Sequence, residues 1–437
     1  MECHFSLADT VRSISAAPSP LQRHCGFLGD ANHEGVRAAP VCVWLSRTER
    51  ARFKPITTIP NEREEMISQI ARLLSAFERR SISFELDLIP LHFENLSFTK
   101  LANWAFTESS ILVKPASPWG YPTVLQVEPT SRCNLRCKVC PVATGLGRPA
   151  GDMDFDLYRR LIDEVKDYVL VLMFWDWGEP FLNDCAFDMI HYARQAGIKV
   201  VCSTNGHIFA DAEKARAVVE AGLDVLVFSV DGITQETYQR YRAYGNLETV
   251  LAGVRNVVSE KCRAGSQFPL VNLRFIVMKH GQHEVAHLRE FSRALGVDVL
   301  TLRKFHSVPR DQEAEEDLVP DQVQYQLPAR TPGGRRAVRV RRNPCKNLWN
   351  CPTIHWDGTV CSCFMDYRQQ RPLGSLTQTS FRKIWRGASY GSLRRSFRKD
   401  WTDVALCGEC AFGFEGGDVG REANAEAVFF KDSQGCG

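Results

Sequence analysis

The fold is decided by the stretch Glu128-Pro-Thr-Ser-Arg-Cys133-Asn-Leu-Arg-Cys137-Lys-Val-Cys140, in which three cysteines are spaced C-x3-C-x2-C. Three thiolates in one loop can hold three corners of an iron–sulfur cubane, whereas a cluster held wholly by protein uses four cysteines. One iron then stays open for chemistry, much as a catalytic zinc keeps an open position. The alternative is a zinc site or unrelated thiols, but zinc sites usually present C-x2-C pairs. We therefore predict a cluster held by Cys133, Cys137 and Cys140.

Short apolar runs and amphipathic stretches alternate from Thr123 onward, and the cysteine loop, residues 128–140, follows the first run. The apolar runs are Val124–Glu128, Leu170–Trp175, Lys199–Ser203, Asp224–Val230, Val271–Met278 and Val297–Leu302. Amphipathic stretches of helical length lie at 154–168, 184–196, 211–221, 246–260 and 283–295. Six βα units in series predict an α/β fold with a parallel sheet, open or rolled into a partial barrel. Sites in such folds form at the carboxyl ends of the strands.

The cysteine loop resembles that of the radical S-adenosylmethionine (SAM) superfamily, and the resemblance extends over about residues 121–305. It implies a partial (β/α)6 TIM-like barrel and a [4Fe–4S] cluster whose open iron is chelated by the amino and carboxylate groups of SAM. It also implies that the cluster, reduced by a donor such as flavodoxin or ferredoxin, cleaves SAM to a radical that abstracts hydrogen from a substrate. Val139 stands where the family often has an aromatic residue, but its backbone remains available to adenine.

Gly178-Glu179-Pro180 ends the second predicted strand. It is similar to the family's glycine–glutamate motif, which implies that the Glu179 carboxylate receives the amino group of SAM. A carboxylate beside an ammonium group makes a charge-assisted contact, and a glycine lets backbone approach closely. The alternative for the tripeptide is an ordinary turn.

Ser203 and Asn205 end the third predicted strand in the sequence Ser-Thr-Asn-Gly. They resemble the family's segment near the ribose and carboxylate of SAM, which hydroxyl and amide groups suit. A polar turn is the alternative, and the two roles can coexist. Asp231, after the fourth strand, is either a further site residue or the N-cap of the helix after Thr234.

A second group of cysteines lies between residues 345 and 410. The Asp357-Gly358 pair within it predicts a β-hairpin. The segment resembles the SPASM or twitch extension of radical SAM enzymes, which implies one auxiliary [4Fe–4S] cluster. Its spacing fits the short form with four ligands, because the further cysteine run of the long form is absent after the last pair. The implied ligands are Cys345, Cys363, Cys407 and Cys410.

Several alternatives remain open in this segment. Cys351 is the main rival ligand, because the long form also uses a C-x5-C pair, and Cys361 is the next. A structural zinc site with the same thiolates is a further alternative, since thiolates alone do not separate zinc from iron–sulfur. Asp366 stands where some sulfatase maturases carry an acidic base, which implies a catalytic role in deprotonating a substrate radical. The alternative for Asp366 is a turn aspartate paired with an arginine.

Composition limits the remaining possibilities. The chain has 437 residues, 16 cysteines, a net charge of +3 and 44% hydrophobic residues. The near balance of charge gives no case for nucleic acid or a membrane surface as a partner, and no apolar run of membrane-spanning length is present. No secretion signal is evident, so we expect a cytoplasmic protein, in which clustered cysteines bind metal more often than they form disulfides.

The expected domains are an N-terminal extension of unclear role (1–120), a radical SAM core (121–305), a linker (306–344), an auxiliary-cluster domain (345–415) and a tail (416–437). This organisation predicts an enzyme that oxidises or rearranges a small metabolite with the help of the auxiliary cluster. The short form of the extension favours that class, and so does the lack of a recognisable leader-peptide module. A maturase acting on a peptide or protein side chain is one alternative, and a non-catalytic electron-transfer protein is another.

Overall fold

The computed structural model describes residues 71, 74–306, 317–327, 345–408, 410 and 423–430, all within the unit Ala71–Gly437. The other unit, Met1–Ile70, and most of the expected linker lie outside the described residues. Among the described helices, none is both long enough and apolar enough to cross a membrane.

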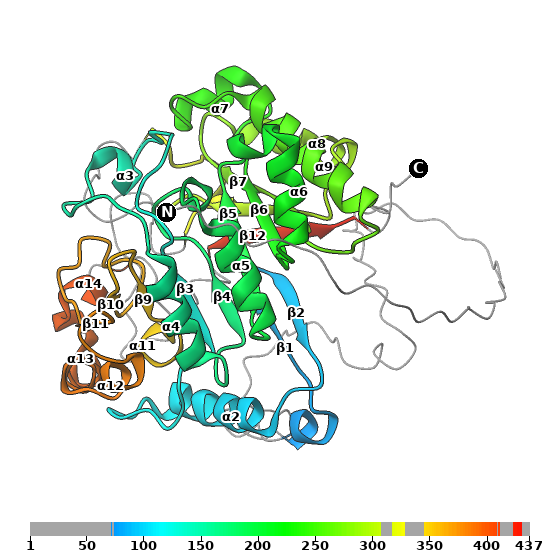
Figure 1. The fold of residues 1–437 in the computed structure, drawn as a ribbon. Helices are drawn as coiled ribbons and strands as arrows, with labels where there is room; N and C mark the ends of the chain where they lie inside the picture. The colour runs from blue at the N-terminus through cyan, green and yellow to red at the C-terminus, as the bar shows by residue number, and fades with distance from the viewer. Residues whose placement is uncertain are drawn as a thin grey trace, which may run out of the picture. The chain divides into compact units, whose positions relative to one another are not determined.

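Six parallel strands in chain order form the centre of a ten-stranded sheet (Figure 1). Each pairs in parallel with the next, as the six predicted βα units require. The strands are β3 (Val124–Val127), β4 (Val171–Met173), β5 (Lys199–Thr204), β6 (Val225–Ser229), β7 (Leu270–Val277) and β8 (Val299–Lys304). The predicted partial (β/α)6 barrel is confirmed, and the carboxyl ends of all six strands meet at one edge.

Helices cover the outer face of this sheet and begin where the sequence provides caps. Asp154 accepts the backbone N–H of Leu157 at 2.9 Å, and Asp211 and Asn246 cap later helices with their side chains. The predicted outer helices are α4 (Phe155–Val165), α5 (Ala186–Gln195), α6 (Ala212–Glu220), α8 (Leu247–Arg263) and α9 (Leu288–Ala294). The short α7 (Gln235–Tyr241) is the helix expected after Thr234, and two of its seven residues are buried.

The auxiliary segment extends the sheet at its β3 edge. Strand β9 (Thr353–Ile354) pairs in parallel with β3, and β10 (Thr359–Cys361) returns antiparallel to β9. The predicted hairpin is confirmed, with Gly358 in the left-handed region at φ 82°. The remaining elements of the segment are β11 (Gly374–Ser375), α11 (Asn347–Asn350), α12 (Phe381–Trp385), α13 (Ala388–Lys399) and α14 (Ala405–Gly408).

The opposite edge is closed by a strand that the sequence did not indicate. Strand β12 (Asn424–Phe429) pairs antiparallel with β8, although we expected only a tail there. Its sequence, Asn-Ala-Glu-Ala-Val-Phe, lacks the run of β-branched residues that marks a strand. Its pairing with β8 therefore specifies the strand more than its own composition does. The short helix α3 (Pro141–Thr144) follows the cysteine loop, and five 3-10 helices are also described: η1 (Pro180–Leu182), η2 (His207–Ala210), η3 (Gln282–His287), η4 (Val323–Tyr325) and η5 (Trp401–Asp403).

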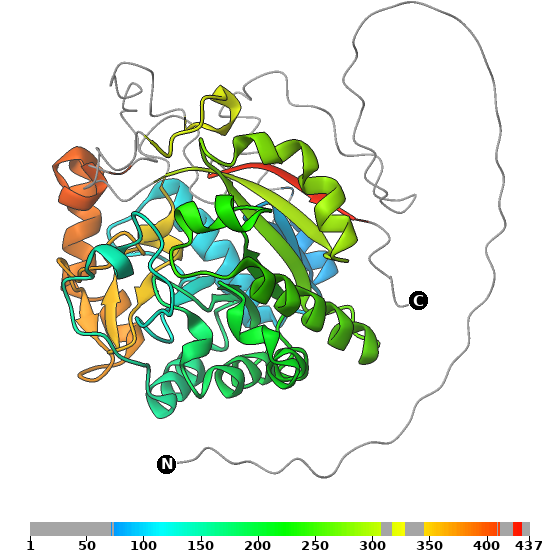
Figure 2. The same cartoon turned by 90° about the horizontal axis from the view of Figure 1, so that it is seen from above.

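A hairpin from the N-terminal extension packs against the inner face of the sheet. Strands β1 (Ile82–Leu86) and β2 (Ile89–Phe93) precede α2 (Phe98–Val113), and they share one buried cluster with inner-face side chains of β3 to β6. The outer helices share a separate cluster with the alternate side chains of the same strands. Figure 2 shows the hairpin on the side of the strands away from the outer helices.

The tip of this hairpin ends in a buried ion pair. Asp87, at the turn between β1 and β2, accepts a hydrogen bond from Arg274 of β7 at 2.6 Å and lies 3.5 Å from Arg303 of β8. Asn424 of β12 donates to its other oxygen at 3.3 Å. Although burial opposes ionisation, the two guanidinium groups hold the pKa of Asp87 below its ordinary value.

We expect Asp87→Ala to destabilise the protein strongly, because it leaves two buried cations without their shared carboxylate. Removing one partner of a buried pair typically costs about 3–5 kcal/mol. Urea unfolding of the anaerobic protein measures the loss. Arg159→Ala, which breaks an ion pair with half-exposed partners on α4, is the control and should cost about 0–1 kcal/mol. Equal unfolding midpoints for the two variants would contradict the role of the hairpin tip.

Candidate active site

Three cysteine thiols meet in the loop that follows β3. Cys137 is buried, Cys133 and Cys140 are partly buried, and all three are free thiols. Burial and the nearby charges of Glu179 and Cys137 raise the pKa of Cys133 to about 11. Burial and Cys137 likewise raise the pKa of Cys140 to about 12. Thiolates this close repel one another, so they need a bound metal centre to be deprotonated together. The set fits three corners of an iron–sulfur cluster.

Gly178 lies directly against this loop. A Cβ atom at this position would come within 1.9 Å of the Thr130 carbonyl oxygen, so only glycine fits. The N–H of Glu179 then donates to the Arg132 carbonyl at 2.8 Å. The next residue, Pro180, is buried and begins η1. The glycine thus fixes the distance between the end of β4 and the cysteine loop.

The Glu179 carboxylate is buried and points between β4 and β5. It accepts the Thr204 hydroxyl and the Asn205 backbone N–H, each at 2.7 Å. Burial raises the pKa of Glu179 to about 7 despite these donors. An ammonium group beside it would favour the charged carboxylate and be held by it. This geometry suits the predicted contact with the amino group of SAM.

Asn205 and Ser203 are placed at two different parts of the site. The Asn205 side-chain amide donates to Asn134 of the cysteine loop at 2.7 Å and lies 3.9 Å from the Cys133 sulfur. The Ser203 hydroxyl lies 3.3 Å from the Ser229 hydroxyl on the neighbouring strand. The structure therefore brings Asn205 to the cluster position and Ser203 to the inner face, and their contacts with SAM stay predictions.

Asp231 has a different role from the one that the sequence suggested. Thr234, not Asp231, caps α7. Asp231 is fully buried and forms an ion pair with Arg242, whose Nη2 lies 2.5 Å away. Arg242 also donates from Nη1 to the Cys137 sulfur at 3.5 Å. Sequence reasoning missed Arg242, because an arginine just after a short polar helix carries no signature of its own.

The four implied auxiliary ligands also come together. Burial and then the charges of Cys407, Cys345 and Cys410 raise the pKa of Cys363. Burial and the charges of Cys345 and Cys410 likewise raise the pKa of Cys407. We call these four residues the auxiliary cysteine set. Four thiols in mutual reach fit a cluster held wholly by cysteine.

The two rival cysteines lie at the border of this set. Burial and the charge of Cys345 raise the pKa of Cys351 to about 12, and Cys345 is the one thiol that contributes to this shift. The Cys361 thiol makes a hydrogen bond with Asp366. The geometry therefore favours the four implied ligands, whose assignment stays a prediction.

Asp366 is held within a turn of the auxiliary segment. It is 1% exposed, and its two oxygens accept the backbone N–H groups of Gln370 at 2.7 Å and Arg371 at 3.0 Å. These bonds favour the turn role over that of a catalytic base. The arginine supplies its backbone N–H to the turn. The catalytic role of Asp366 stays a prediction.

A buried acid–base cluster that the sequence did not indicate lies where β3, β4 and β9 meet. The Nδ1 atom of His355 is 3.3 Å from Glu128 Oε2 and 3.7 Å from Asp176 Oδ2, and Arg148 pairs with the other Glu128 oxygen. These three potential ligand groups could hold a proton or a metal ion. Among the described residues, His355 Nε2 and Asp176 Oδ2 have no hydrogen-bond partner. Burial and the Glu128 charge raise the pKa of Asp176 well above its ordinary value.

Register places this acid–base cluster on the inner face of the sheet. Val127 pairs with Ile354, and both belong to the core on the helix side. The next residues, Glu128 and His355, therefore point to the inner face. No sequence motif marked the cluster, because His355 lies 227 residues from Glu128 and meets it only when β9 pairs with β3.

Side chains from the barrel bind the loop that follows the β9–β10 hairpin within the auxiliary segment. The Trp177 indole N–H donates to the Phe364 carbonyl at 3.0 Å, and Arg148 Nε donates to the Tyr367 carbonyl at 2.6 Å. Trp177 also contacts the Tyr367 ring edge to face. These contacts hold the auxiliary segment close to the ends of β3 and β4.

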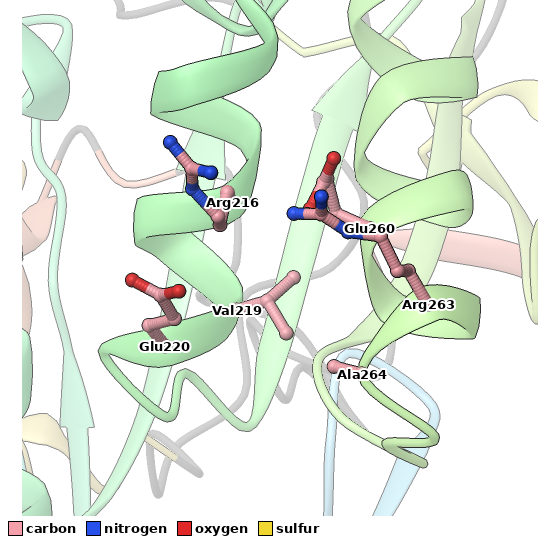
Figure 3. A pocket seen from close by; sticks show the side chains of 6 residues that line it. All are labelled: Arg216, Val219, Glu220, Glu260, Arg263 and Ala264. Atoms are coloured by element: carbon pink, nitrogen blue, oxygen red, sulfur yellow. The ribbon is translucent and has the colours of Figure 1, made fainter.

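A surface pocket on the outer layer is separate from this site. It lies between α6 and α8 near their C-terminal ends, which in a βα fold adjoin the amino ends of the strands. Figure 3 shows that its walls are mainly charged side chains, and Glu260 and Arg263 form an ion pair there. The lining residues are Arg216, Val219, Glu220, Glu260, Arg263 and Ala264. They offer no group suited to the chemistry described above.

Comparison with known families identifies two domains in this chain. Residues 127–289 match the model of the radical SAM superfamily, and residues 345–411 match that of SPASM, an iron–sulfur cluster-binding domain. The chain contains a radical SAM domain followed by a SPASM domain. Radical SAM enzymes bind SAM with a [4Fe–4S] cluster, and SPASM domains bind auxiliary iron–sulfur clusters. The two cysteine sets provide donors suited to both.

This radical SAM chain is similar to curated relatives over part of its length. It is 29% identical over 204 residues to the tungsten-containing aldehyde ferredoxin oxidoreductase cofactor-modifying protein of Pyrococcus furiosus, a match covering 45% of this chain and 55% of that protein. It is 31% identical over 201 residues to the AdoMet-dependent heme synthase of Methanosarcina barkeri, covering 45% and 54%. The chain thus matches about half the length of these relatives.

The fold is similar to that of solved radical SAM structures. SuiB of Streptococcus suis bound to S-adenosylmethionine has a TM-score of 0.50 and 14% identity, covering 72% of this chain and 77% of that chain. SuiB bound to its precursor peptide SuiA has a TM-score of 0.50 and 12% identity, covering 80% and 83%. At these identities the likeness shows the fold alone.

We expect Glu179→Gln to weaken SAM binding while leaving the iron content unchanged. Loss of a charge-assisted contact costs about 1.5–3 kcal/mol, which raises the SAM dissociation constant by roughly 10-fold to 150-fold. Equilibrium binding to the anaerobically reconstituted protein measures the change. Glu213→Gln on the exposed face of α6 is the matched control. If both variants bind SAM like the wild type, Glu179 is not part of the site.

We expect about eight iron atoms per chain, because each of two cubanes holds about four. Replacing Cys133, Cys137 and Cys140 with alanine should remove about half of the iron and abolish SAM cleavage, because the open iron is lost. Replacing the auxiliary cysteine set should remove the other half. Cys351→Ala and Cys361→Ala are the matched controls and should retain all of it. Zinc bound in place of iron at the auxiliary set would contradict the auxiliary cluster.

Proposed function

We propose that this radical SAM enzyme carries out a net two-electron oxidation of a small polar molecule. Bound clusters and SAM supply the 5′-deoxyadenosyl radical that removes hydrogen and an acceptor for the electron that the substrate must then lose. The cysteine loop would hold the first cluster and the auxiliary cysteine set the second. Glu179 would hold the amino group of SAM, and Ser203 and Asn205 would contact its other polar groups.

An oxidation of this kind needs an acceptor for a proton and an acceptor for an electron. Candidates for both lie on one hairpin, and this observation is the main support for the proposal. His355 directly follows β9 in the β9–β10 hairpin and lies among carboxylates on the inner face. The hairpin ends two residues before Cys363 of the auxiliary cysteine set. A substrate at the carboxyl ends of the strands would thus have a titratable group and an electron acceptor on one side. A rearrangement would require neither of them.

The inner face favours a small substrate over a peptide segment. The β1–β2 hairpin covers this face, and Asp87 at its tip contacts Arg274. Arg274 pairs in register with Ser229, which lies beside Ser203. The hairpin therefore reaches the level of the predicted SAM contacts. A small substrate would lie between the hairpin tip and the cysteine loop.

The polar lining of this region favours a polar substrate. Arg274 has a buried Nε atom with no hydrogen-bond partner among the described residues, and Asp176 and His355 have similar atoms across the sheet. Buried polar atoms of this kind normally find partners. A ligand with several hydroxyl or charged groups would supply them.

We expect small molecules, not peptides, to stimulate SAM cleavage. The test separates an extract of the source organism into small-molecule and peptide fractions and measures 5′-deoxyadenosine formed by the reconstituted enzyme with each. The triple variant of the cysteine loop is the control for background cleavage. The product should contain two hydrogen atoms fewer than its precursor. Stimulation by the peptide fraction alone would favour a maturase, and a redox-neutral product would contradict the oxidation.

A further inference from the structure

The cysteine loop is clamped to the short segment that follows α7. Backbone N–H groups on either side of Cys137 donate to the carbonyl oxygens on either side of Arg242. The two bonds are Arg136 N–H to Ala243 O at 3.1 Å and Lys138 N–H to Tyr241 O at 3.0 Å. Like neighbours in a β-ladder, Cys137 and Arg242 therefore stand opposite one another. The Arg242 Nη1 atom lies 3.5 Å from the Cys137 sulfur in a hydrogen bond.

Asp231 fixes the orientation of this guanidinium group. Its Oδ2 atom accepts Arg242 Nε at 2.6 Å and Nη2 at 2.5 Å, while Oδ1 accepts the Ile276 N–H at 2.8 Å. Asp231 is 0% exposed, so its carboxylate has no access to water that could compete for these donors. The fork geometry of arginine leaves Nη1 as the group directed toward sulfur. The arrangement is rigid because every partner belongs to a strand end or a hydrogen-bonded loop.

A hydrogen bond from a cation to a cysteine sulfur changes the energy of an iron–sulfur cluster. It withdraws negative charge from the thiolate, and it stabilises the reduced cluster, which is more negative, more than the oxidised one. Burial strengthens the effect because few water dipoles screen it. Asp231 weakens it, since its charge lies on the far side of the same guanidinium group.

We propose that Arg242, held by Asp231, is a positioning residue that raises the reduction potential of the cluster bound at the cysteine loop through its contact with Cys137. This inference rests on the proposed function, since it requires the loop to hold a cluster. It assigns to Arg242 a control over how readily the cluster accepts the electron needed for SAM cleavage. An ion pair that only shapes the loop would not change the potential of clusters that are correctly bound.

The experiment is a potentiometric titration of the anaerobic holoenzyme followed by electron paramagnetic resonance. The signal of the first cluster is the one lost in the triple cysteine variant of the loop. Arg242→Gln removes the charge but keeps a side chain of similar shape, and its cluster potential should become more negative than that of the wild type. Arg240→Gln is the matched control, because it removes an exposed arginine two residues away and should leave the potential unchanged.

Asp231→Asn provides a second variant with the opposite expected sign. Removing the compensating carboxylate leaves the guanidinium charge unopposed, so the cluster potential should become less negative. If Arg242→Gln lowers the iron content, Asp231→Asn still tests the proposal at full iron content. Equal potentials in wild type, Arg240→Gln and the variants that retain iron would overturn the inference. Absence of iron from the wild-type loop would instead overturn the proposed function.

Discussion

The pairing of β3 with strands on both sides is the constraint on which the rest of the site depends. On one side β3 pairs with β4, which carries Gly178 and Glu179 to the cysteine loop. On the other it pairs with β9, which carries the auxiliary hairpin. The loop that would hold the first cluster continues directly from its carboxyl end. Two cysteine sets more than 200 residues apart in sequence are therefore placed relative to each other by one short strand.

Buried carboxylates at strand ends recur throughout this site, and three of them are matched by cations. Glu128 pairs with Arg148, Asp231 with Arg242, and Asp87 with two arginines. A buried charge without such a partner would cost several kcal/mol in order of magnitude. These pairs fix the loops that surround the cluster positions. Asp87 joins segments 187 residues apart, whereas Glu128 and Asp231 pair with arginines 20 and 11 residues away. Asp176 and Glu179 have no such partner, and burial raises the pKa of each.

Much of the fold followed from periodicity and local spacing. The six parallel strands, their outer helices and the hairpin at Asp357-Gly358 were all predicted, because strong amphipathic patterns, caps and turn residues are local signals. The hairpin at Asp87 and strand β12 were not. The first inserts into the inner face and the second adds to an edge, so both depend on distant partners. The sequence of β12 shows weak strand preference, whereas β1 alternates apolar and polar residues as a strand does.

The candidate site likewise has parts that local sequence predicts and parts that depend on distant contacts. The chemistry of the cysteines was readable from spacing, because thiolates in one loop must lie close together whatever the fold. The positions of Glu179 and Asn205 followed from their place after consecutive strands of a parallel sheet. The base role of Asp366 rested on a resemblance alone, and the turn that binds both of its oxygens favours a structural role.

The sequence by itself determined the fold class and the family, because these depend on the short spacing of the cysteine loop and on a repeated local pattern, while the auxiliary cysteine set was implied by a resemblance. Only the tertiary structure decided which polar residues meet around the cysteines. Arg242 opposite Cys137 and His355 between Glu128 and Asp176 are contacts across 105 to about 230 residues. No local preference encodes such contacts, since they arise only when parallel pairing and loop clamping bring buried charges within reach of one another.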